Sequence, residues 1–312
     1  MPGFAPVFVT LMYQLLSIVM RPFLILFSAT LFLSVSSCDK LSPAPDKTQF
    51  ATEPTQAMIA PGTADEVSGM ADSRSMPGNV WFQEDSGNPT ELLLLGHDGK
   101  SKGRIAVPNS QNTDWEDMAM GPGPTSGVNY IYLGDIGDNN AGRPACQIYR
   151  FAEPKAVTDK IGTVERINYT YPDGPRDAEA LFVDPQTSDI WLISKRETKV
   201  RLYKLGYPQN INVVTTAQAF GELPISVVTG AAISPDGTEI LVRTYTSVYY
   251  WKRNAGQTIA DALQSKAGLQ LAYRLEPQGE AICFDKDAKG FFTSSERPTN
   301  TANTSLFYYG KR

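Results

Sequence analysis

The sequence predicts an all-β fold, a β-propeller of four-stranded blades with five blades. Five times along the chain, a short start signal precedes an apolar strand, a turn and a second apolar strand that ends in charged or Gly-rich residues. The starts recur 48, 63, 50 and 51 residues apart, at Ser68, Glu116, Glu179, Thr229 and Glu280. A repeat of about fifty residues is typical of propeller blades. Six blades are the alternative, and the extra blade would have to lie in the long interval 116–179.

The strands of a blade can be followed from one repeat to the next. The third repeat has apolar runs at 180–184, 190–194 and 201–205, with the turn 185–188 after the first run. The fourth repeat has such runs at 231–234, 239–244 and 248–251, and the fifth has them at 281–285, 291–294 and 306–309. Turn residues between β-branched and aromatic runs predict hairpins. The inner runs are almost continuously apolar because a blade has neighbours on both faces, and we expect no helix within the repeats.

More polar stretches between the repeats predict the outer, fourth strands, at 104–107, 164–171, 213–220 and 269–275. The last repeat stops at Arg312 without such a strand. An open strand edge would reduce stability and invite aggregation. The stretch 55–59, upstream of the first repeat, is the expected donor, so an N-terminal strand should close the last blade.

An apolar segment precedes the predicted propeller. The apolar run 22–35 is followed by two serines and Cys38. A run of this length is short for a membrane span and suits a signal peptide. It resembles a bacterial lipoprotein signal, which implies lipid attachment at Cys38 and a place in the bacterial cell envelope, periplasmic or on the outer surface. If translation begins at Met1 and not at Met20, the apolar block 4–35 is long enough for an uncleaved anchor.

These observations divide the chain into three parts. We expect a lipoprotein-type signal peptide at 1–37, a tether with the closing strand at 38–65, and one propeller domain at 66–312. Hydrophobic residues make up 42% of the chain and charged residues 20%, which is ordinary for a globular protein. The net charge of −5 argues against a nucleic-acid partner. We expect a monomer.

Residue content excludes several kinds of catalytic site. His97 is the only histidine, and it lies in a Gly-His-Asp-Gly turn that we expect to be exposed and far from the strand starts. A Ser-His-Asp triad, a histidine-rich metal site and a Cys-His pair each need imidazole. Cys146 and Cys283 lie on a third and a first strand of different repeats. A disulfide between them would have to cross the ring, so two unpaired thiols are predicted.

Charged residues recur where one face of the propeller should lie. Because the strands of a blade run outward from the axis, the start of each first strand and the end of each second strand share a face. The strand starts contribute Glu66, Asp114, Glu116, Asp117, Asp177, Glu179 and Glu280. The ends of second strands contribute 84–88, 134–139, 195–197, 243–244 and 296–297. This predicts a channel mouth crowded with carboxylates and a few cations. The alternative is that these charges only tie neighbouring blades together.

The mouth supplies the candidate site residues. Candidate ligand-binding residues are Asp85, Asp117, Lys195, Arg196, Arg243 and Arg297. Glutamate recurs at one equivalent position as Glu116, Glu179 and Glu280, and burying three carboxylates near one axis is costly unless they meet cations, a metal or protons. Such oxygen ligands suit Ca²⁺ or Mg²⁺, the cofactors that we consider. The best candidate metal ligands are Asp135, Asp138 and Asn139, followed by Asp85 and Asn88 of the first repeat. A Gly-rich aspartate loop without an ion is the alternative.

Several stretches carry a resemblance to known proteins, namely 68–74 with 81–87, 114–119 with 134–139, and 177–180. They resemble uncharacterised secreted bacterial β-propeller proteins, are similar to TolB-like propellers, and more distantly resemble esterase-like phytase and gluconolactonase-type propellers. The gluconolactonase-type resemblance implies a divalent ion at the mouth, which Glu116, Asp138 and Asn139 could bind. A phytase-like activity would imply an anion-binding surface, to which Arg74, Lys195, Arg196, Arg243 and Arg297 could contribute.

Two functions follow from these features. The first is a membrane-tethered extracytoplasmic propeller that binds a small polar ligand or a protein partner at the acidic mouth, with lipidated Cys38 contacting the membrane. The second is a divalent-metal-assisted hydrolase of a lactone, ester or phosphoester, with catalytic residues drawn from Glu116, Glu179 and Glu280. We favour binding, because no residue set supplies a nucleophile, a base and an orienting group together.

Overall fold

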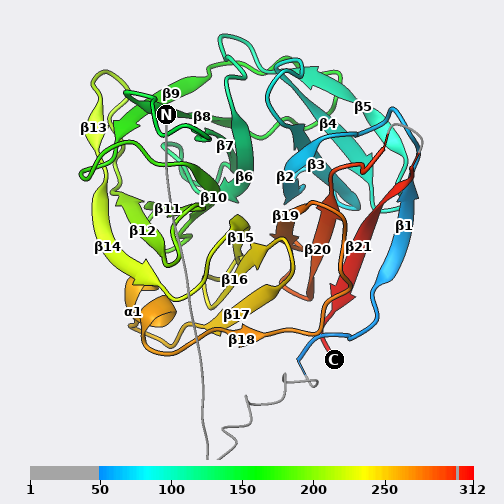
Figure 1. Ribbon diagram of the computed structural model, residues 1–312. Helices are drawn as coiled ribbons and strands as arrows, with labels where there is room; N and C mark the ends of the chain where they lie inside the picture. The colour runs from blue at the N-terminus through cyan, green and yellow to red at the C-terminus, as the bar shows by residue number, and fades with distance from the viewer. Residues whose placement is uncertain (1–48, 300–301) are drawn as a thin grey trace, which may run out of the picture. The chain divides into compact units, whose positions relative to one another are not determined.

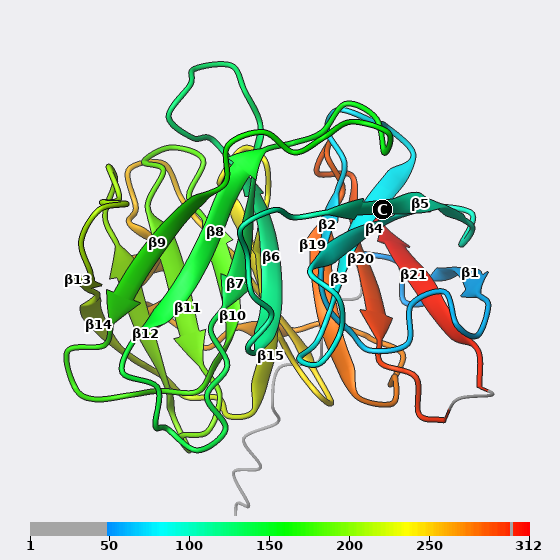
Figure 2. The same ribbon diagram turned by 90° about the horizontal axis from the view of Figure 1, so that it is seen from above.

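The computed structural model describes residues 49–299 and 302–312, which form five sheets around a central axis (Figure 1). The first blade is β2 (Val67–Asp72), β3 (Asn79–Glu84), β4 (Glu91–Gly96) and β5 (Ser101–Ala106). The second is β6 (Trp115–Gly121), β7 (Tyr130–Asp135), β8 (Cys146–Ala152) and β9 (Glu165–Thr170). Figure 2 shows the second blade with its strands lying side by side.

The remaining three blades repeat this order from the axis outward. The third is β10 (Ala178–Val183), β11 (Ile190–Ser194), β12 (Val200–Leu205) and β14 (Gln218–Leu223). The fourth is β15 (Val228–Ile233), β16 (Glu239–Thr244), β17 (Val248–Lys252) and β18 (Leu269–Gln270). The fifth is β19 (Gly279–Phe284), β20 (Gly290–Ser295), β21 (Thr304–Gly310) and β1 (Thr55–Ile59). The prediction of an all-β propeller is confirmed.

The five first strands close into a ring. β2 packs against β6, β6 against β10, β10 against β15, β15 against β19, and β19 against β2. The long interval between the second and third starts holds the connection from β7 to β8 and the outer strands of the second blade. The blade number is therefore five, and the six-blade alternative is wrong.

The N-terminal strand closes the last blade, as predicted. β1 pairs antiparallel with β21 over five residues, from Thr55 opposite Tyr308 to Ile59 opposite Thr304. Just before β1, the Phe50 ring packs edge-on against Phe291, with ring centroids 5.0 Å apart. Chain closure thus covers the edge of β21 that the end of the sequence would leave open.

The outer strands depart from the prediction in two places. The stretch predicted at 269–275 forms a strand only over Leu269–Gln270. The stretch predicted as a single strand at 213–220 is divided between two blades, because β13 (Thr215–Thr216) pairs in parallel with β9 of the second blade. The fourth strand of the third blade, β14, begins only after this crossover. The fourth blade also contains a short helix, α1 (Ile259–Gln264), which we did not expect. Thr258 caps it, and its apolar residues pack beside β14 and β17.

The hydrophobic core lies between the blades. Five clusters of buried apolar residues occur, and each joins two neighbouring blades. In the cluster between the first and second blades, Trp81 and Leu94 meet Met118 and Tyr149. Burial of apolar surface at about 25 cal/mol per Å² makes these seams the main source of stability. The nearly continuous apolar runs of the sequence are explained by this packing on both blade faces.

The predictions for the two cysteines and for the histidine have different outcomes. Cys146 on β8 and Cys283 on β19 are buried and unpaired, as predicted. The expectation of an exposed His97 is wrong, because its ring is half-buried, donates a hydrogen bond from Nε2 to Asp72 over 2.7 Å, and packs on Phe292. Within residues 49–299 and 302–312, no helix has the length and apolar character needed to cross a membrane. The predicted signal, Cys38 and most of the tether lie outside the described residues.

Candidate functional site

The recurring start signal has a structural cause. In every blade, the pairing of the first strand with the second shifts by one residue near the start of the first strand. The extra residues in the first four blades are Ser68, Glu116, Glu179 and Thr229, and in the fifth the shift spans Glu280. A β-bulge of this kind redirects a side chain at the end of a strand. We call the side of the ring where the first strands begin the mouth face, and the other side the opposite face.

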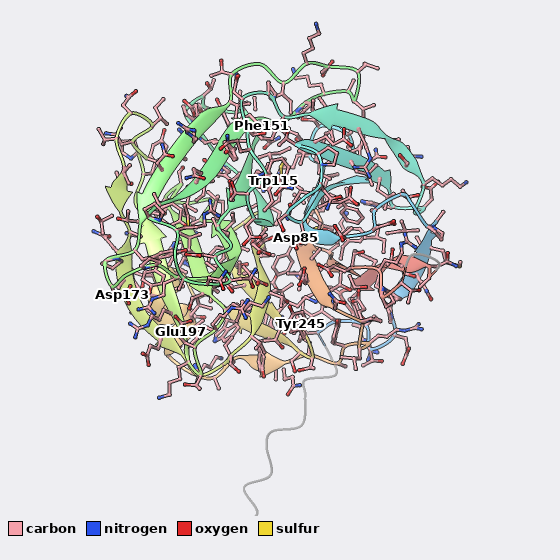
Figure 3. The ribbon with its side chains drawn as sticks, turned by 45° about the horizontal axis from the view of Figure 1, so that its top comes forward. Asp85, Trp115, Phe151, Asp173, Glu197 and Tyr245 are labelled. Atoms are coloured by element: carbon pink, nitrogen blue, oxygen red, sulfur yellow. The ribbon has the colours of Figure 1, made fainter. Side chains whose placement is uncertain are left out.

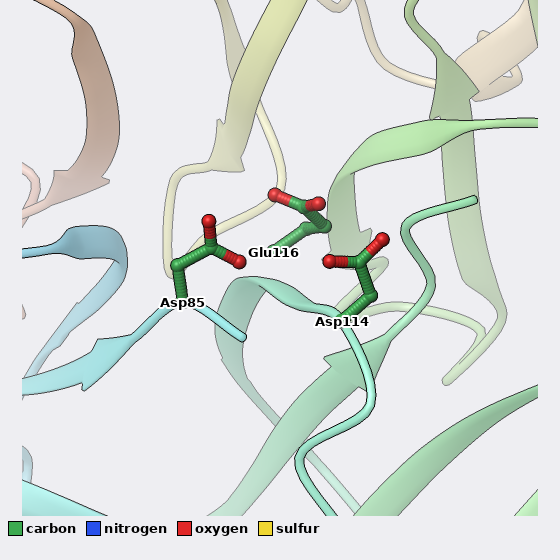
Figure 4. Close-up of side chains that lie close together, drawn as sticks. All are labelled: Asp85, Asp114 and Glu116. Atoms are coloured by element: carbon green, nitrogen blue, oxygen red, sulfur yellow. The ribbon is translucent and has the colours of Figure 1, made fainter. Parts of the chain in front are cut away.

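Three carboxylates meet at the mouth between the first two blades. Asp85 follows β3, Asp114 precedes β6, and Glu116 lies in β6, and one oxygen from each lies within 4.8 Å of the others. Their carboxylates face one another in Figure 4, and Asp85 lies near the middle of the ring in Figure 3. Within the described residues, none of the three forms a salt bridge. Lys195 and Arg143 act on Asp85 and Asp114 from a distance, but no cation of the described chain pairs directly with the group.

The surroundings oppose ionisation of this group. Burial, and then the charges of Glu179 and Asp85, raise the pKa of Glu116 well above its usual range. Burial and the neighbouring Asp85 raise the pKa of Asp114 to about 6. Burial also raises the pKa of Asp85. A cation bound here would remove the repulsion that these shifts record.

A second carboxylate group shares Glu116 and already contains cations. Glu116, Asp177 and Glu179 also bring oxygens within 4.8 Å of one another. The Lys195 ammonium pairs with Glu179, and the Arg196 guanidinium pairs with Asp177. Burial still raises the pKa of Glu179 to about 8, although Lys195 lowers it. The second oxygen of Glu179 is buried without a hydrogen-bond partner, so a polar partner is missing there.

The mouth continues toward the fourth and fifth blades. The Lys195 ammonium lies 5.0 Å from the centre of the Tyr245 ring, and the Tyr245 hydroxyl donates to Glu280 over 3.3 Å. Burial raises the pKa of Glu280. Burial, followed by the charge of Glu280, raises the pKa of Glu296 to about 8. Glu116, Glu179 and Glu280 are thus brought to one mouth, as the sequence predicted for their position.

Asp117 lies below this mouth and serves the fold. Its fully buried carboxylate accepts hydrogen bonds from the backbone N–H of Met118 (2.8 Å), Leu181 (2.9 Å) and Ala231 (3.3 Å). These three groups belong to the first strands of three blades. A Cβ atom on Gly69 would lie 2.7 Å from the Met118 nitrogen, which leaves room only for glycine. Asp117 therefore ties three first strands together beneath the mouth.

Two predicted ligand-binding arginines are also held by the protein. The buried Arg243 guanidinium donates to the carbonyls of Ala281 and Ser294 at 2.6 Å and pairs with Glu276 at 3.1 Å. Arg297 pairs with Asp65 at 2.6 Å, beside the segment that links β1 to β2. Both join blades or strands, and neither lies in the two carboxylate groups.

The predicted metal ligands are engaged in a different way. Asp135 pairs with Arg143 at 2.8 Å, and Asp138 accepts the backbone N–H groups of Gly142 (2.9 Å) and Arg143 (2.7 Å). Asn139 binds the side chain of Arg196. Each of these three residues thus has a partner within the protein, while Asp85, Asp114 and Glu116 bring their carboxylate oxygens together. Asp85 was already a candidate from the sequence, and the alternation in Asp114-Trp115-Glu116 at the start of β6 is the signal that could have added the other two.

The fold and the mouth define a five-bladed propeller with an acidic mouth, and comparisons with known proteins add little to this description. No family model matches the chain, and no curated protein matches it. A chain in the crystal structure of a nidogen/laminin complex is similar with a TM-score of 0.44 and 11% identity, over 74% of this chain and 73% of that one. The assignment of five blades comes from the strand pairing and does not depend on this similarity.

Proposed function

We propose that this propeller binds a divalent cation at Asp85, Asp114 and Glu116, and through the ion a small polar ligand at the mouth face. The observation that carries the proposal is the convergence of three carboxylates with no cationic side chain paired to them within the described residues. Glu116 is almost completely buried, and an ionised carboxylate in such a place needs a compensating charge.

The chemistry of the ligands favours Ca²⁺ or Mg²⁺. Carboxylate oxygens are hard ligands, and no imidazole or thiol lies among the residues of either carboxylate group. Ca²⁺ takes six to eight oxygen ligands, so three carboxylates leave several positions for water or for oxygens of a ligand. The second group, with Lys195 and Arg196 already in place, would then form the polar wall beside the ion.

Hydrolysis of a lactone, ester or phosphoester is a second candidate function. The observation in its favour is the pKa of Glu179, which burial raises to about 8 although Lys195 lowers it, so that a carboxyl group beside the ion ligands titrates near the range of an effective general acid or base. A bound divalent ion would polarise a water or a carbonyl, and Glu179 would take up or release the proton. Binding without turnover remains our first proposal, because no nucleophile with an orienting partner lies at the mouth among the described residues.

Attachment to the membrane completes the proposal. We infer that the segment before Cys38 directs the chain out of the cytoplasm and that lipid at Cys38 holds it in the cell envelope. The support is the apolar run 22–35 and the small residues before the cysteine. A tether of about ten residues would then separate the lipid from the first described residue, Gln49.

Isothermal titration calorimetry with CaCl₂ and MgCl₂ tests the ion site. We expect one site in the unmodified protein and none in Glu116→Gln. The matched control is Asp287→Asn, an exposed aspartate on the opposite face, which should leave the titration unchanged. Equal binding by Glu116→Gln and the unmodified protein would disprove the site. Screening the calcium-loaded protein for turnover of lactones and phosphoesters, with Glu179→Gln as a comparison that keeps the three ion ligands, separates the two functions.

A further inference from the structure

The opposite face has an unusually apolar loop between β12 and β14. Seven large apolar side chains are exposed in the described part of the chain, and four of them lie in this loop. They are Tyr207 (41% exposed), Ile211 (41%), Val213 (55%) and Val214 (56%). The sequence from 205 to 221 contains no charged residue. An exposed apolar patch without charges marks a surface for a protein or a membrane.

This loop is held in place at both ends. The Tyr207 backbone N–H donates to Asp189 over 2.8 Å, and the Gln209 side chain donates to the Ser188 carbonyl over 2.9 Å. Arg150 of the second blade donates to Gln209 over 2.7 Å. At its far end the loop runs into β13, which pairs with β9. The apolar side chains are therefore presented by a fixed segment that bridges two blades.

The described chain also begins on the opposite face. Gln49 lies beside Glu239, the first residue of β16, and Phe50 bridges to Lys311 just beyond β21. The start of β16 and the end of β21 both lie on the opposite face. The apolar run 22–35 ends only fourteen residues before Gln49. At about 3.5 Å per residue, fourteen residues span at most roughly 50 Å. A membrane bound by this run would thus lie within reach of the face that carries the loop.

We propose that the loop 207–214 rests on the surface of the lipid bilayer to which the N-terminal segment attaches the protein. Valine, isoleucine and tyrosine side chains partition into the interface of a bilayer, and tyrosine is enriched there. The mouth face carries the two carboxylate groups, whose ionised members would be repelled by anionic lipids. The propeller then stands with the loop on the membrane and the acidic mouth turned to the aqueous side. The ion site is open to solutes in this orientation.

Fluorescence quenching in vesicles tests this orientation. The full-length chain is reconstituted in vesicles of phosphatidylethanolamine and phosphatidylglycerol, with an environment-sensitive fluorophore on Val213→Cys. The matched control is Leu275→Cys, a 65% exposed apolar residue on the mouth face. Cys146 and Cys283 are buried and do not compete for the label. Cys38 is replaced by serine in every variant, so that the uncleaved apolar run 22–35 provides the membrane attachment. We expect nitroxide lipids with the spin label near the headgroups to quench the label at 213 several-fold more than the label at 275.

Three results would overturn the proposal. These are equal quenching at the two positions, stronger quenching at 275, and a full-length chain that stays in solution when the vesicles are sedimented. Thermal melting of each labelled variant in detergent establishes that the propeller is intact. The Val213→Ser, Val214→Ser double variant provides a second readout. It should lower quenching of a label at Ile211→Cys several-fold, whereas Val227→Ser with Leu275→Ser on the mouth face should not.

Discussion

The two faces of the propeller use the same kind of residue in opposite ways. Each face has buried carboxylates at the ends of strands near the blade seams. On the opposite face these are Asp72, Glu153, Asp184, Glu239 and Asp285. Every one of them accepts hydrogen bonds from a neighbouring strand or blade. Asp184, for example, pairs with Arg253 of the fourth blade at 3.0 Å, and Tyr308 donates to Asp285 over 2.6 Å.

The mouth face has no such matching for its central carboxylates. Asp85, Asp114 and Glu116 converge without a salt bridge among the described residues. Burial raises the pKa of all three, and the charge of Asp85 adds to the shifts of Asp114 and Glu116. A buried carboxylate stabilises a fold only when its charge is matched. The comparison therefore assigns the opposite-face acids to stability and the central mouth acids to binding. Acidic residues that look alike in the sequence therefore differ in role according to whether a cation or a hydrogen-bond donor is paired with them.

Removing the closing strand β1 should cause the largest loss of stability of the changes considered. Deleting residues 50–61 would expose the edge of β21 and would remove the contact between Phe50 and Phe291. We expect the melting temperature to fall by roughly 10 °C or more, because several kcal/mol of packing and strand pairing is lost. Circular dichroism melting of the deletion and the parent chain measures this. An unchanged melting temperature would show that the fifth blade does not need β1.

Replacing one buried carboxylate of the opposite face should cause the second-largest loss of stability. Glu153 accepts hydrogen bonds from the Ser73 hydroxyl (2.6 Å), from the Ser75 backbone N–H and hydroxyl (2.9 and 2.7 Å), and from Trp81 (3.3 Å). Glu153→Ala leaves several of these donors without a partner and should reduce the free energy of unfolding by about 3 kcal/mol. Urea denaturation measures it. Calcium binding at the mouth should be unchanged, and a loss of both would contradict the division between the faces.

Much of this fold could be predicted from the sequence because its determinants are local and repeated. The fifty-residue period, the apolar runs and the missing last strand fix the blade order, and β1 had few other places to pair. The strand start could also be predicted, since Glu116, Glu179 and Glu280 recur at one register. The crossover of Thr215–Thr216 to the second blade could not, because a two-residue pairing across blades leaves no periodic signal.

The candidate site was less predictable because it depends on which partner each charge meets. Asp138 looked like a metal ligand, yet its carboxylate accepts the N–H groups of its own loop at Gly142 and Arg143. Arg243 looked available at the end of a second strand, yet it is buried against Glu276 and two carbonyls. Such partners are fixed by three-dimensional packing across seams, and nothing in the spacing of one repeat encodes them.

The counterpart to Glu153→Ala is Glu116→Gln on the mouth face. Removing a carboxylate that is buried beside other carboxylates should increase the free energy of unfolding by roughly 1 kcal/mol in metal-free buffer at neutral pH. Calcium should no longer raise the melting temperature of this variant, whereas it should raise that of the parent by several degrees through linkage. A variant that is less stable than the parent in chelator would place Glu116 among the structural acids.

The last prediction concerns the pH dependence of stability without metal, whose sign follows from the carboxylates of the mouth face. The pKa of Asp114 is raised to about 6, and those of Glu179 and Glu296 to about 8, so the folded state binds more protons than the unfolded state between about pH 4 and 8. These groups therefore add stability at low pH that is lost as the pH rises through about 6 and then 8.

Urea denaturation from pH 5 to 8 in chelator should show this decline, and Glu116→Gln should make it shallower. Saturating calcium should reverse it, because deprotonated carboxylates bind the ion. A decline that calcium leaves untouched would mean that protons and the ion do not share these oxygens.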